Sequence, residues 1–294
     1  RELMAGTASS GRRTARWVPY AMVAPTMIFL VVFFVIPIFT LFKTSLSVNT
    51  GSLYVPVQKF NWEWGNYSAA FTQYREEIVR SFSYAGLATA IMIVLAYPLA
   101  YVLAFKAGRW KNLMLGMVIL PFFITFLVRT IAWKTILADD GFVVDAMGAI
   151  GLLPAEGRIL STPWAVIGGL VYNFLPFMVL PIYVSLEKID PRLIEASRDL
   201  YSSTGRGFRK VILPLSMPGV LAGSLLCFIP ASGDFINAEY LGSTKTTMMG
   251  TVIQKQFLIV KDYPTAAAMS FVLMAIVLAM VLVYTRALGT EDLV

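Results

Sequence analysis

Two acidic side chains, each followed directly by an aromatic residue, come just after a long apolar run in the C-terminal half of the chain. They are Asp234 with Phe235 and Glu239 with Tyr240. Carboxylates pair with cationic groups, and aromatic rings attract the same groups through the cation–π interaction, so this combination suits an extended polycation. The two acids are also compatible with an ordinary solvated loop, and both interpretations remain open from sequence.

Polar and amphipathic residues interrupt a second apolar run, at 164–186. Tyr172, Asn173 and Tyr183 lie within it and are candidates for the lining of a solute pathway. The two tyrosines are equally typical of anchors at a membrane interface. Arg129 lies late in another apolar run, where we expect it to snorkel toward water or to brace a carboxylate, since its charge would repel a cation.

The residue types needed for several kinds of catalysis are absent from the sequence. The chain has no His and a single Cys, Cys227, which excludes His-based acid–base chemistry, His-rich metal sites and an internal disulfide. Cys227 lies in an apolar run and is expected to be a small packing residue. The sequence also contains no G-x-x-x-x-G-K-[ST] phosphate loop. We therefore expect neither an enzyme nor a cofactor-binding chain.

The composition is that of an integral membrane protein. Hydrophobic residues make up 57% of the chain, charged residues only 14%, and the mean hydropathy is +0.71. The net charge of +7 does not indicate nucleic acid, because the basic residues fall mainly in short loops between apolar runs.

Six apolar segments are long enough to cross a bilayer, whose core of about 30 Å requires about 20 residues of helix. They lie at about 18–42, 78–105, 113–133, 164–186, 211–233 and 266–285. The first follows Arg12, Arg13 and Arg16 but is too long for a typical signal-peptide core, so we expect a retained helix. The sequence thus predicts an all-helical membrane protein with a terminal segment at 1–17, a transmembrane domain at 18–286 and a tail at 287–294.

The distribution of Lys and Arg predicts the orientation in the membrane. With both termini inside, the shorter loops on the cytoplasmic side hold most of the basic residues, while the rest are spread through longer segments or lie near span ends. We therefore expect both termini, and the charged loop at about 187–214, to be cytoplasmic.

This charged loop has the pattern of a short helix, a turn and a second helix. Asp190-Pro191 is a strong helix start, because Asp accepts hydrogen bonds from free amides of the first turn and Pro fits the first helical position. We expect this helix to end near Tyr201, a turn at 202–205, and a second helix from Arg206 into the fifth span. Pro214, Pro218 and Gly219 favour an elbow at the membrane entry, and kinks that a span simply tolerates are the alternative.

Close helix packing is the expected role of two groups of glycines in the spans. Gly168 and Gly169 are adjacent in the fourth span, and Gly219 and Gly223 are four residues apart in the fifth. Small residues at such spacings allow two helix backbones to approach each other.

The order of residues in the charged loop is similar to the coupling motif of ATP-binding-cassette importer permeases. Glu195-Ala196-Ser197 corresponds to its Glu-Ala-Ala, and Val211-Ile212-Leu213-Pro214 to its Ile-x-Leu-Pro. Tyr201 stands where that family usually has Gly, which serves a bend that requires a positive φ or a close approach. We expect Gly205 to carry the bend instead.

Longer stretches resemble the spermidine/putrescine branch of these permeases. They are LVYNFLPFMVLPIYVSLEKIDPRLIEASRDL at 170–200, LPLSMPGVLAGSLLCFIPASGDF at 213–235, YLGS at 240–243 and KQFLIVKDYPTAAA at 255–268. The resemblance covers most of the chain from the second span onward, whereas the part before it fits by hydropathy alone.

The resemblance implies a fold, a location and a set of partners. The chain would be a six-helix permease subunit of type I importer architecture in the bacterial inner membrane, forming half of a polyamine pathway with a second, homologous permease. Two cytoplasmic ATPase subunits would bind ATP and Mg²⁺, and an extracytoplasmic binding protein would deliver the solute. The ATPase contact would fall on the loop residues Glu195, Ala196, Ser197, Asp199, Tyr201, Gly205, Leu213 and Pro214.

Three alternatives remain open from the sequence. The first is an importer permease for another small solute such as phosphonate, sulfate, iron or a sugar. The second is a secondary transporter or channel without ATPase partners, although the predicted spans are nearly devoid of acids and show no inverted repeat. The third is an anchor or assembly subunit with no pathway of its own.

Overall fold

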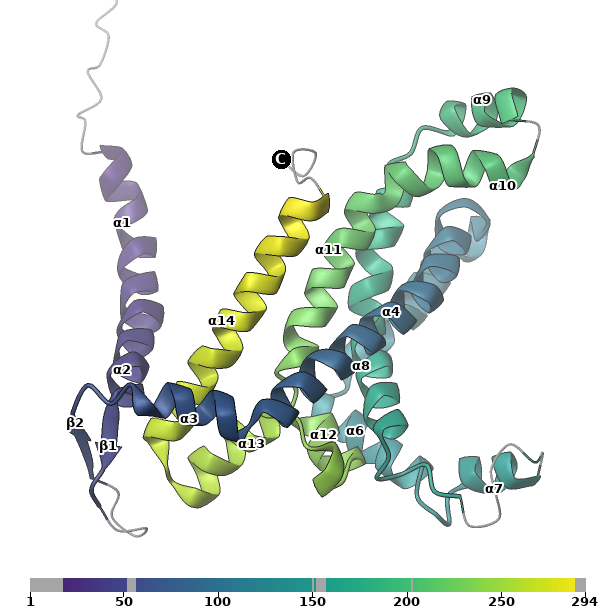
Figure 1. Cartoon of the computed structure of the whole chain (residues 1–294). Coiled ribbons are helices and arrows are strands. Elements are labelled where there is room, and N and C mark those ends of the chain that lie inside the picture. The colour runs from purple at the N-terminus through teal and green to yellow at the C-terminus, as the bar shows by residue number, and fades with distance from the viewer. Residues whose placement is uncertain (1–17, 52–56, 150, 152–156, 202, 289–294) are drawn as a thin grey trace, which may run out of the picture.

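The computed structural model describes residues 18–51, 57–149, 151, 157–201 and 203–288. The described chain is almost entirely helical, with one two-stranded antiparallel ribbon. Its long helices run between two ends of the molecule, which we call the α9 end and the α12 end after short helices that lie there (Figure 1). The predicted N-terminal segment and most of the predicted C-terminal tail lie outside the described residues.

Five single helices in the described residues are long and apolar enough to cross a membrane. Their bounds differ from the predicted spans by only a few residues, because about 20 apolar residues are what a bilayer core requires. They are α1 with α2 (Val18–Leu30 and Ile36–Ser45, joined through a π-helical stretch), α4 (Arg75–Phe105), α8 (Pro163–Glu187), α11 (Leu213–Ser232) and α14 (Tyr263–Leu288).

The predicted third span is not one straight helix, and this part of the prediction is wrong. Helix α5 (Lys111–Ile119) and a 3₁₀ turn lead to α6 (Phe126–Ile136), and the two halves meet at an angle of 95°. Pro121 lacks an N–H and cannot continue the α-helical hydrogen bonding, and Ile124 and Thr125 then take extended backbone conformations. Counted as one bent crossing, this pair brings the number of spans to six.

Shorter elements collect at the two ends. At the α12 end the chain forms β1 (Ser47–Asn49), β2 (Gln58–Phe60), α3 (Gly65–Gln73), α7 (Phe142–Ala149), α12 (Ile236–Leu241) and α13 (Met249–Lys255) (Figure 1). The strands pair with Val48 opposite Lys59. At the other end lie α9 (Pro191–Tyr201) and α10 (Thr204–Gly207).

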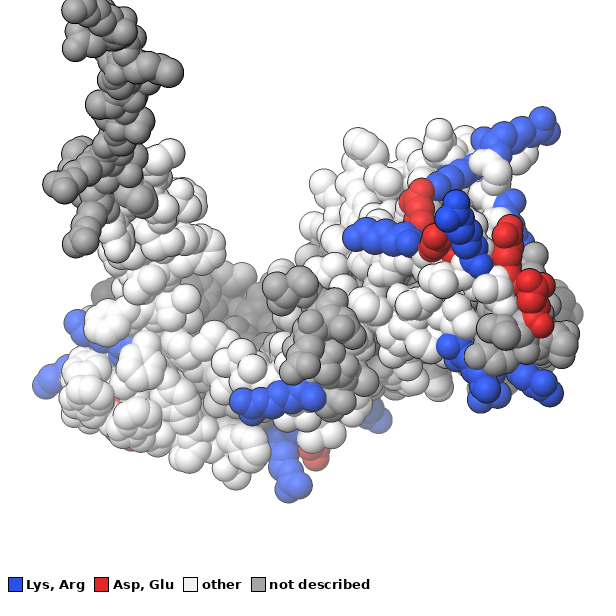
Figure 2. Space-filling view, turned by 90° about the horizontal axis from the view of Figure 1, so that it is seen from above, with Lys and Arg blue, Asp and Glu red and all other residues white. Residues whose placement is uncertain are grey.

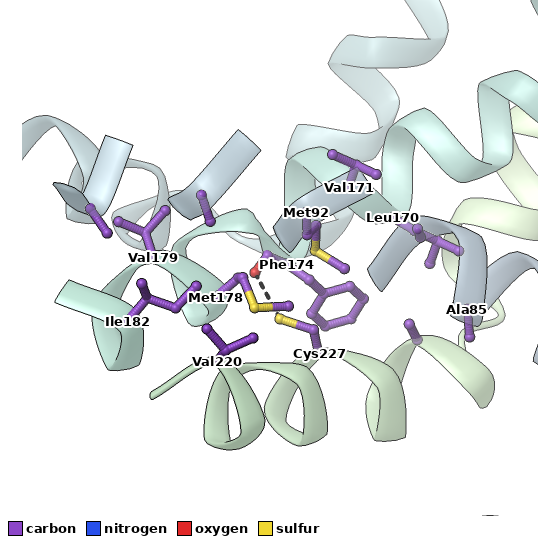
Figure 3. Packing of buried hydrophobic residues seen from close by; sticks show 14 of the residues in the cluster. Ala85, Met92, Leu170, Val171, Phe174, Met178, Val179, Ile182, Val220 and Cys227 are labelled. Carbon is purple, nitrogen blue, oxygen red and sulfur yellow. Dashed lines mark hydrogen bonds between the residues drawn. The ribbon is translucent and has the colours of Figure 1, made fainter. Parts of the chain in front are cut away.

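The main hydrophobic core lies where α4, α8 and α11 pack together. Helix α4 contributes a stripe of small residues with helical spacing, including Ala85, Ala88, Ala96 and Ala100, all fully buried. Figure 3 shows part of this core, in which Cys227 donates its S–H to the carbonyl of Phe174 at 3.4 Å. The predicted packing role of Cys227 is confirmed.

Glycines allow the close approach of α8 and α11. A Cβ added at Gly219 would lie 2.5 Å from the carbonyl oxygen of Pro181, and one at Gly223 would lie 2.9 Å from the sulfur of Met178. Gly169 is equally confined, by Leu241, whereas Gly168 has no atom within 4 Å of such a Cβ. The packing prediction is confirmed for three of these glycines and wrong for Gly168.

The first helix stands apart from the rest of the described chain. None of its apolar window within 20–45 is buried, although Phe42 at its end touches Phe271 of α14, with ring centroids 5.7 Å apart. Figure 1 shows α1 separated from the main bundle. Helix α2 packs against α14, so it is mainly the α1 half of this crossing that lacks packing within the described chain.

Candidate functional site

Helix α9 begins and ends where the sequence predicts. The carboxylate of Asp190 accepts a hydrogen bond from the backbone N–H of Arg192 at 2.9 Å, and Pro191 occupies the first helical position. The helix ends at Tyr201. The predicted capping of this helix is thus confirmed.

The turn after α9 differs from the prediction. Helix α10 already begins at Thr204, with the carbonyl of Ser203 accepting the N–H groups of Arg206 and Gly207 at 3.1 and 3.2 Å. Gly205 therefore lies inside a helix and does not have a positive φ. The prediction that Gly205 carries the bend is wrong, and Tyr201 needs no positive φ because its backbone is still helical.

The outward surface of α9 is charged and accessible. Glu195, Ala196 and Asp199 are exposed, and Figure 2, seen from the α9 end, shows acidic and basic side chains gathered on the side of the molecule where α9 and α10 lie. The side chains of Ser197 and Tyr201 lie outside the described part of the structure. An exposed Glu next to an exposed Ala leaves room for close contact with another protein.

A continuous helical path connects this surface to the membrane-crossing core. From α10 the chain passes through a π-helical stretch, Phe208–Ile212, directly into α11, whose first residues are Leu213 and Pro214. Figure 1 shows α10 lying across the end of the molecule and α11 descending from it, which agrees with the predicted elbow. Within the stretch, Phe208 packs edge-on against Tyr97 of α4, with ring centroids 5.6 Å apart.

The α8 side of the same end is fixed by an ion pair. Lys111 of α5 pairs with Glu187 at the last turn of α8. The ammonium of Lys111 also lies 5.2 Å from the ring centroid of Tyr183. Tyr183 is therefore buried in a structural contact near the α9 end, away from the other predicted pathway residues.

A buried polar cluster joins three helices at the α12 end. The amide nitrogen of Asn173 in α8 donates to Thr130 Oγ1 of α6 and to Asn237 Oδ1 of α12, both at 3.1 Å. All three residues are fully buried. Asn173 Oδ1 and Asn237 Nδ2 have no hydrogen-bond partner among the described residues.

Asp234 lies at the start of α12 and belongs to the same region. Its Oδ1 accepts the backbone N–H of Asn237 at 2.7 Å, so the carboxylate caps this short helix. Only 8% of the residue is exposed. Burial raises the pKa of Asp234 to about 6, while hydrogen bonds from Asn237 act in the opposite direction.

The other predicted pathway residues at this end have partners or limited exposure. Glu239 forms an ion pair with Lys255 at 3.0 Å. The ammonium of Lys134 lies 6.0 Å from the ring centroid of Tyr240, and Tyr172 packs against Trp133 at 5.2 Å between ring centroids. Phe235 remains partly exposed beside the buried Asp234.

Arg129 behaves in neither of the two ways predicted. It is only 6% exposed, so it does not snorkel, and it forms no ion pair with a carboxylate within the described ranges. Its guanidinium carbon lies 5.6 Å from the ring centroid of Phe126, and its Nε and Nη1 lack hydrogen-bond partners there. A buried cation in this state is costly.

The structure thus brings together most, but not all, of the predicted pathway residues. Tyr172 and Asn173 of α8 meet the predicted residues of α12 and of the link between α11 and α12 at one end, where Thr130 and Asn237 were missed from sequence. Asp234 itself was the available signal for a capped helix start, because Asp is among the preferred capping residues. No group of His, Cys, Asp or Glu in the described part of the chain could hold a metal ion.

Five single crossings and one bent crossing, with a capped, exposed helix between two of them, define a multi-pass membrane protein. Within that class, the chain belongs to the family of binding-protein-dependent transport system inner membrane components, whose model matches residues 3–288. The predicted fold class, an all-helical permease of importer type, is confirmed.

Curated relatives cover most of the chain. It is 41% identical over 223 residues to the spermidine/putrescine transport system permease protein PotB of Haemophilus influenzae, covering 76% of this chain and 78% of that protein. It is also 41% identical over 214 residues to PotB of Escherichia coli K12, covering 73% of this chain and 78% of the relative. An inner membrane ABC transporter permease protein of the same bacterium, YdcU, is 32% identical, with coverages of 73% and 72%.

Solved structures with low sequence identity share the fold. A chain of the bacterial alginate ABC transporter in complex with its alginate-bound periplasmic protein superposes with a TM-score of 0.72 at 19% identity, covering 94% of this chain and 95% of that one. A chain of the MetNI methionine ABC transporter gives a TM-score of 0.51 at 16% identity, covering 72% and 91%.

Proposed function

We propose that this chain is the permease subunit of an ATP-driven polyamine importer and forms half of its pathway for spermidine and putrescine. The observation that carries the proposal is the 41% identity to spermidine/putrescine permeases over about three quarters of both chains. None of these matches favours a secondary transporter, a channel or an anchor subunit.

The proposed partners are a second, homologous permease, two cytoplasmic ATPases that bind ATP and Mg²⁺, and an extracytoplasmic binding protein. The unburied first helix supports a membrane partner, and the exposed α9 supports a partner outside the bilayer. The family's description as part of a binding-protein-dependent system supports the last partner. The chain itself needs no cofactor.

We place the α9 end in the cytoplasm of a bacterium, with the chain in the inner membrane. The start of α1, the end of α14 and α9 all lie at this end of the molecule (Figure 1), and the short loops there are rich in Lys and Arg. The permease domain then spans 18–286, with the segments 1–17 and 287–294 on the cytoplasmic side.

In this proposal α9 converts ATPase movement into movement of the spans. Glu195 and Ala196 lie at the centre of the contact, with Ser197, Asp199 and Tyr201 on the same helix. Because α10, the π-helical stretch and α11 form one continuous helical path, a displacement of α9 acts on α11 and on α8, which packs against it. Leu213 and Pro214 mark the entry of this path into the membrane.

The pathway itself is proposed to pass the α12 end near Asp234. A buried carboxylate without an ionic partner in the described residues attracts an ammonium group that approaches it. Phe235 beside it offers a partly exposed ring, and Asn173 belongs to the same polar region. We assign Tyr172, Glu239 and Tyr240 to its edge, and their contacts with Trp133, Lys255 and Lys134 at the same end support this.

The substrate assignment is tested with the reconstituted complex. ATPase activity is measured with the binding protein and with spermidine, putrescine, sulfate, phosphonate or a sugar as the added solute. We expect stimulation by the two polyamines alone. Stimulation by a non-cationic solute only would overturn the assignment while leaving the importer class intact.

The coupling assignment is tested by reversing one charge. Glu195→Lys places a cation at the centre of the exposed face of α9 and is expected to weaken ATPase recruitment and uptake together. Asp145→Lys is the matched control, because Asp145 is an exposed acid of α7 at the opposite end. Equal ATPase recruitment by the two variants and the parent would show that α9 is not the contact.

A further inference from the structure

The segment between the first two crossing helices is unusually rich in aromatic residues. Between positions 60 and 74 the only charged residue is Glu63. The aromatic residues of the segment are Phe60, Trp62, Trp64, Tyr67, Phe71 and Tyr74. These residues belong neither to α9 nor to the buried polar cluster around Asn173.

This segment is held rigidly at the level where two crossing helices end. The amide nitrogen of Asn66 donates to the carbonyls of Ser45 and Ser47 at 2.9 and 3.0 Å, and the hydroxyls of Tyr67 and Ser45 lie 2.6 Å apart. Helix α3 packs on α14, and its Ala70 is fully buried. Figure 1 shows α3 running across the α12 end, between the end of α2 and the start of α4.

Apart from Phe60, which packs on Trp62, the aromatic side chains of the segment divide into two sets. Tyr67 and Tyr74 are half-buried, and both hydroxyls have partners, that of Tyr74 being Gln256 Nε2 at 2.8 Å. Trp62, Trp64 and Phe71 point outward and are 62%, 58% and 53% exposed. We call these three residues the aromatic ledge.

The geometry of the ledge suits a surface rather than a pocket. Trp64 and Phe71 are seven residues apart, so they lie on one stripe of α3, and Ser68 and Thr72 lie beside them on the more polar part of the same exposed face. Trp62 has a φ of 50°. This left-handed backbone conformation is energetically unfavourable for a residue with a bulky side chain. The ring nevertheless stays exposed, packed edge-on against Phe60 with centroids 4.9 Å apart. Backbone strain of this kind is retained where the position of the side chain matters.

We propose that the aromatic ledge is embedded in the headgroup layer of the lipid bilayer at the α12 end and fixes the height and tilt of the first two crossing helices. Trp is enriched at this depth because its ring is apolar and its N–H is polar. The ledge lies in the link between α2 and α4, at the level where these two crossing helices end. Its three large exposed side chains lie beside the polar Ser68 and Thr72, so α3 offers both an apolar and a polar side to the boundary between lipid and water.

The proposal is tested by depth-dependent fluorescence quenching of the complete complex in nanodiscs. Lipids carry a nitroxide either on the headgroup or near the end of the acyl chain. The fluorescence of the two ledge tryptophans is obtained by subtracting the emission of the double variant Trp62→Phe, Trp64→Phe from that of the parent. We expect this emission to be quenched mainly by the headgroup nitroxide. Trp133→Phe is the control, because Trp133 is partly buried against Tyr172 and its emission should respond less.

A second measurement does not depend on tryptophan. In a Cys227→Ser background, a spin label at Phe71→Cys should collide more with oxygen, and one at Thr72→Cys more with a water-soluble nickel reagent. Equal accessibility of both labels to the nickel reagent would overturn the proposal. The proposal would also be overturned if neither lipid nitroxide quenched the ledge fluorescence and only the binding protein changed it. In that case the ledge would be a contact surface for a protein.

Discussion

At Asp234, burial and hydrogen bonding act on the charged form of one carboxylate in opposite directions. Burial is the larger effect and raises the pKa of Asp234 to about 6, above the ordinary value of about 3.9. Between these two values the folded chain holds more protons than the unfolded chain, so this residue makes stability fall as pH rises from about 4 to 6. The carboxylate is then largely ionised at neutral pH.

Replacing Asp234 by Asn removes this titration while keeping the shape of the side chain. We expect the difference in melting temperature between variant and parent to grow in favour of the variant as pH rises from about 4 to 7, by an amount equivalent to at most about 2 to 3 kcal/mol. Polyamine uptake by the variant should fall and lose its dependence on pH near 6. A constant difference in melting temperature would show that Asp234 does not titrate in this range.

Arg129 gives a second prediction at the residue scale. Its guanidinium is buried with two nitrogens that lack partners in the described structure, so Arg129→Met should raise the melting temperature or leave it unchanged. Arg80→Met is the control, because Arg80 donates to the carbonyl of Thr247 at 2.8 Å and its loss should lower the melting temperature. Destabilisation by Arg129→Met equal to that of the control would mean that the guanidinium has a stabilising partner in the assembled protein.

Which polar residues lie in the spans is visible in the sequence, but their partners are not. Asn173 was a candidate from its type alone, yet its partners Thr130 and Asn237 come from helices far away along the chain. Tyr183 has a similar amphipathic character and lies elsewhere, beside Lys111. Tertiary packing, which local patterns do not encode, separates the two cases.

At the scale of elements, crossing helices are predictable because the bilayer sets their length, whereas their direction is not. A hydropathy window reports that residues 113–133 are apolar and says nothing of the 95° bend within the third crossing. Pro121 was the available signal. The start of α10 at Thr204 was missed by two residues, although Ser203 is of a type that favours the position before a helix.

The packing of α8 on α11 gives a prediction with a matched control. In Gly219→Ala the new Cβ would lie 2.5 Å from the carbonyl oxygen of Pro181, so the helices must separate, at a cost of about 1 to 3 kcal/mol. Gly168→Ala meets no atom within 4 Å and should gain helix propensity. We expect the melting temperature of the purified complex to fall for the first variant and not for the second. The same change for both would show that α8 and α11 are not in close contact at Gly219.

At the scale of the whole molecule, the distribution of buried residues in the described chain indicates one subunit of a larger assembly. Its main core lies between α4, α8 and α11, with smaller buried clusters beside it, while the first crossing helix has no buried residue in its apolar window. Between helices in lipid the hydrophobic effect is weak, so an isolated helix gains little by folding back onto its own bundle. A neighbouring subunit would supply the packing and polar contacts that this chain does not.

This arrangement predicts a difference between the chain alone and the assembled importer. Phe29→Cys, Val32→Cys and Phe33→Cys, each in a Cys227→Ser background, replace exposed residues around the first helix. In the chain alone, a nitroxide spin label at each of the three positions should collide freely with oxygen dissolved in the bilayer, because the residues replaced are all exposed in the described structure. In the complex with the second permease, the labels on one side of the helix should lose oxygen accessibility, while the others still face lipid and keep it. Equal oxygen accessibility of every position in both samples would contradict a partner on this helix and would leave the first crossing as an independent membrane anchor.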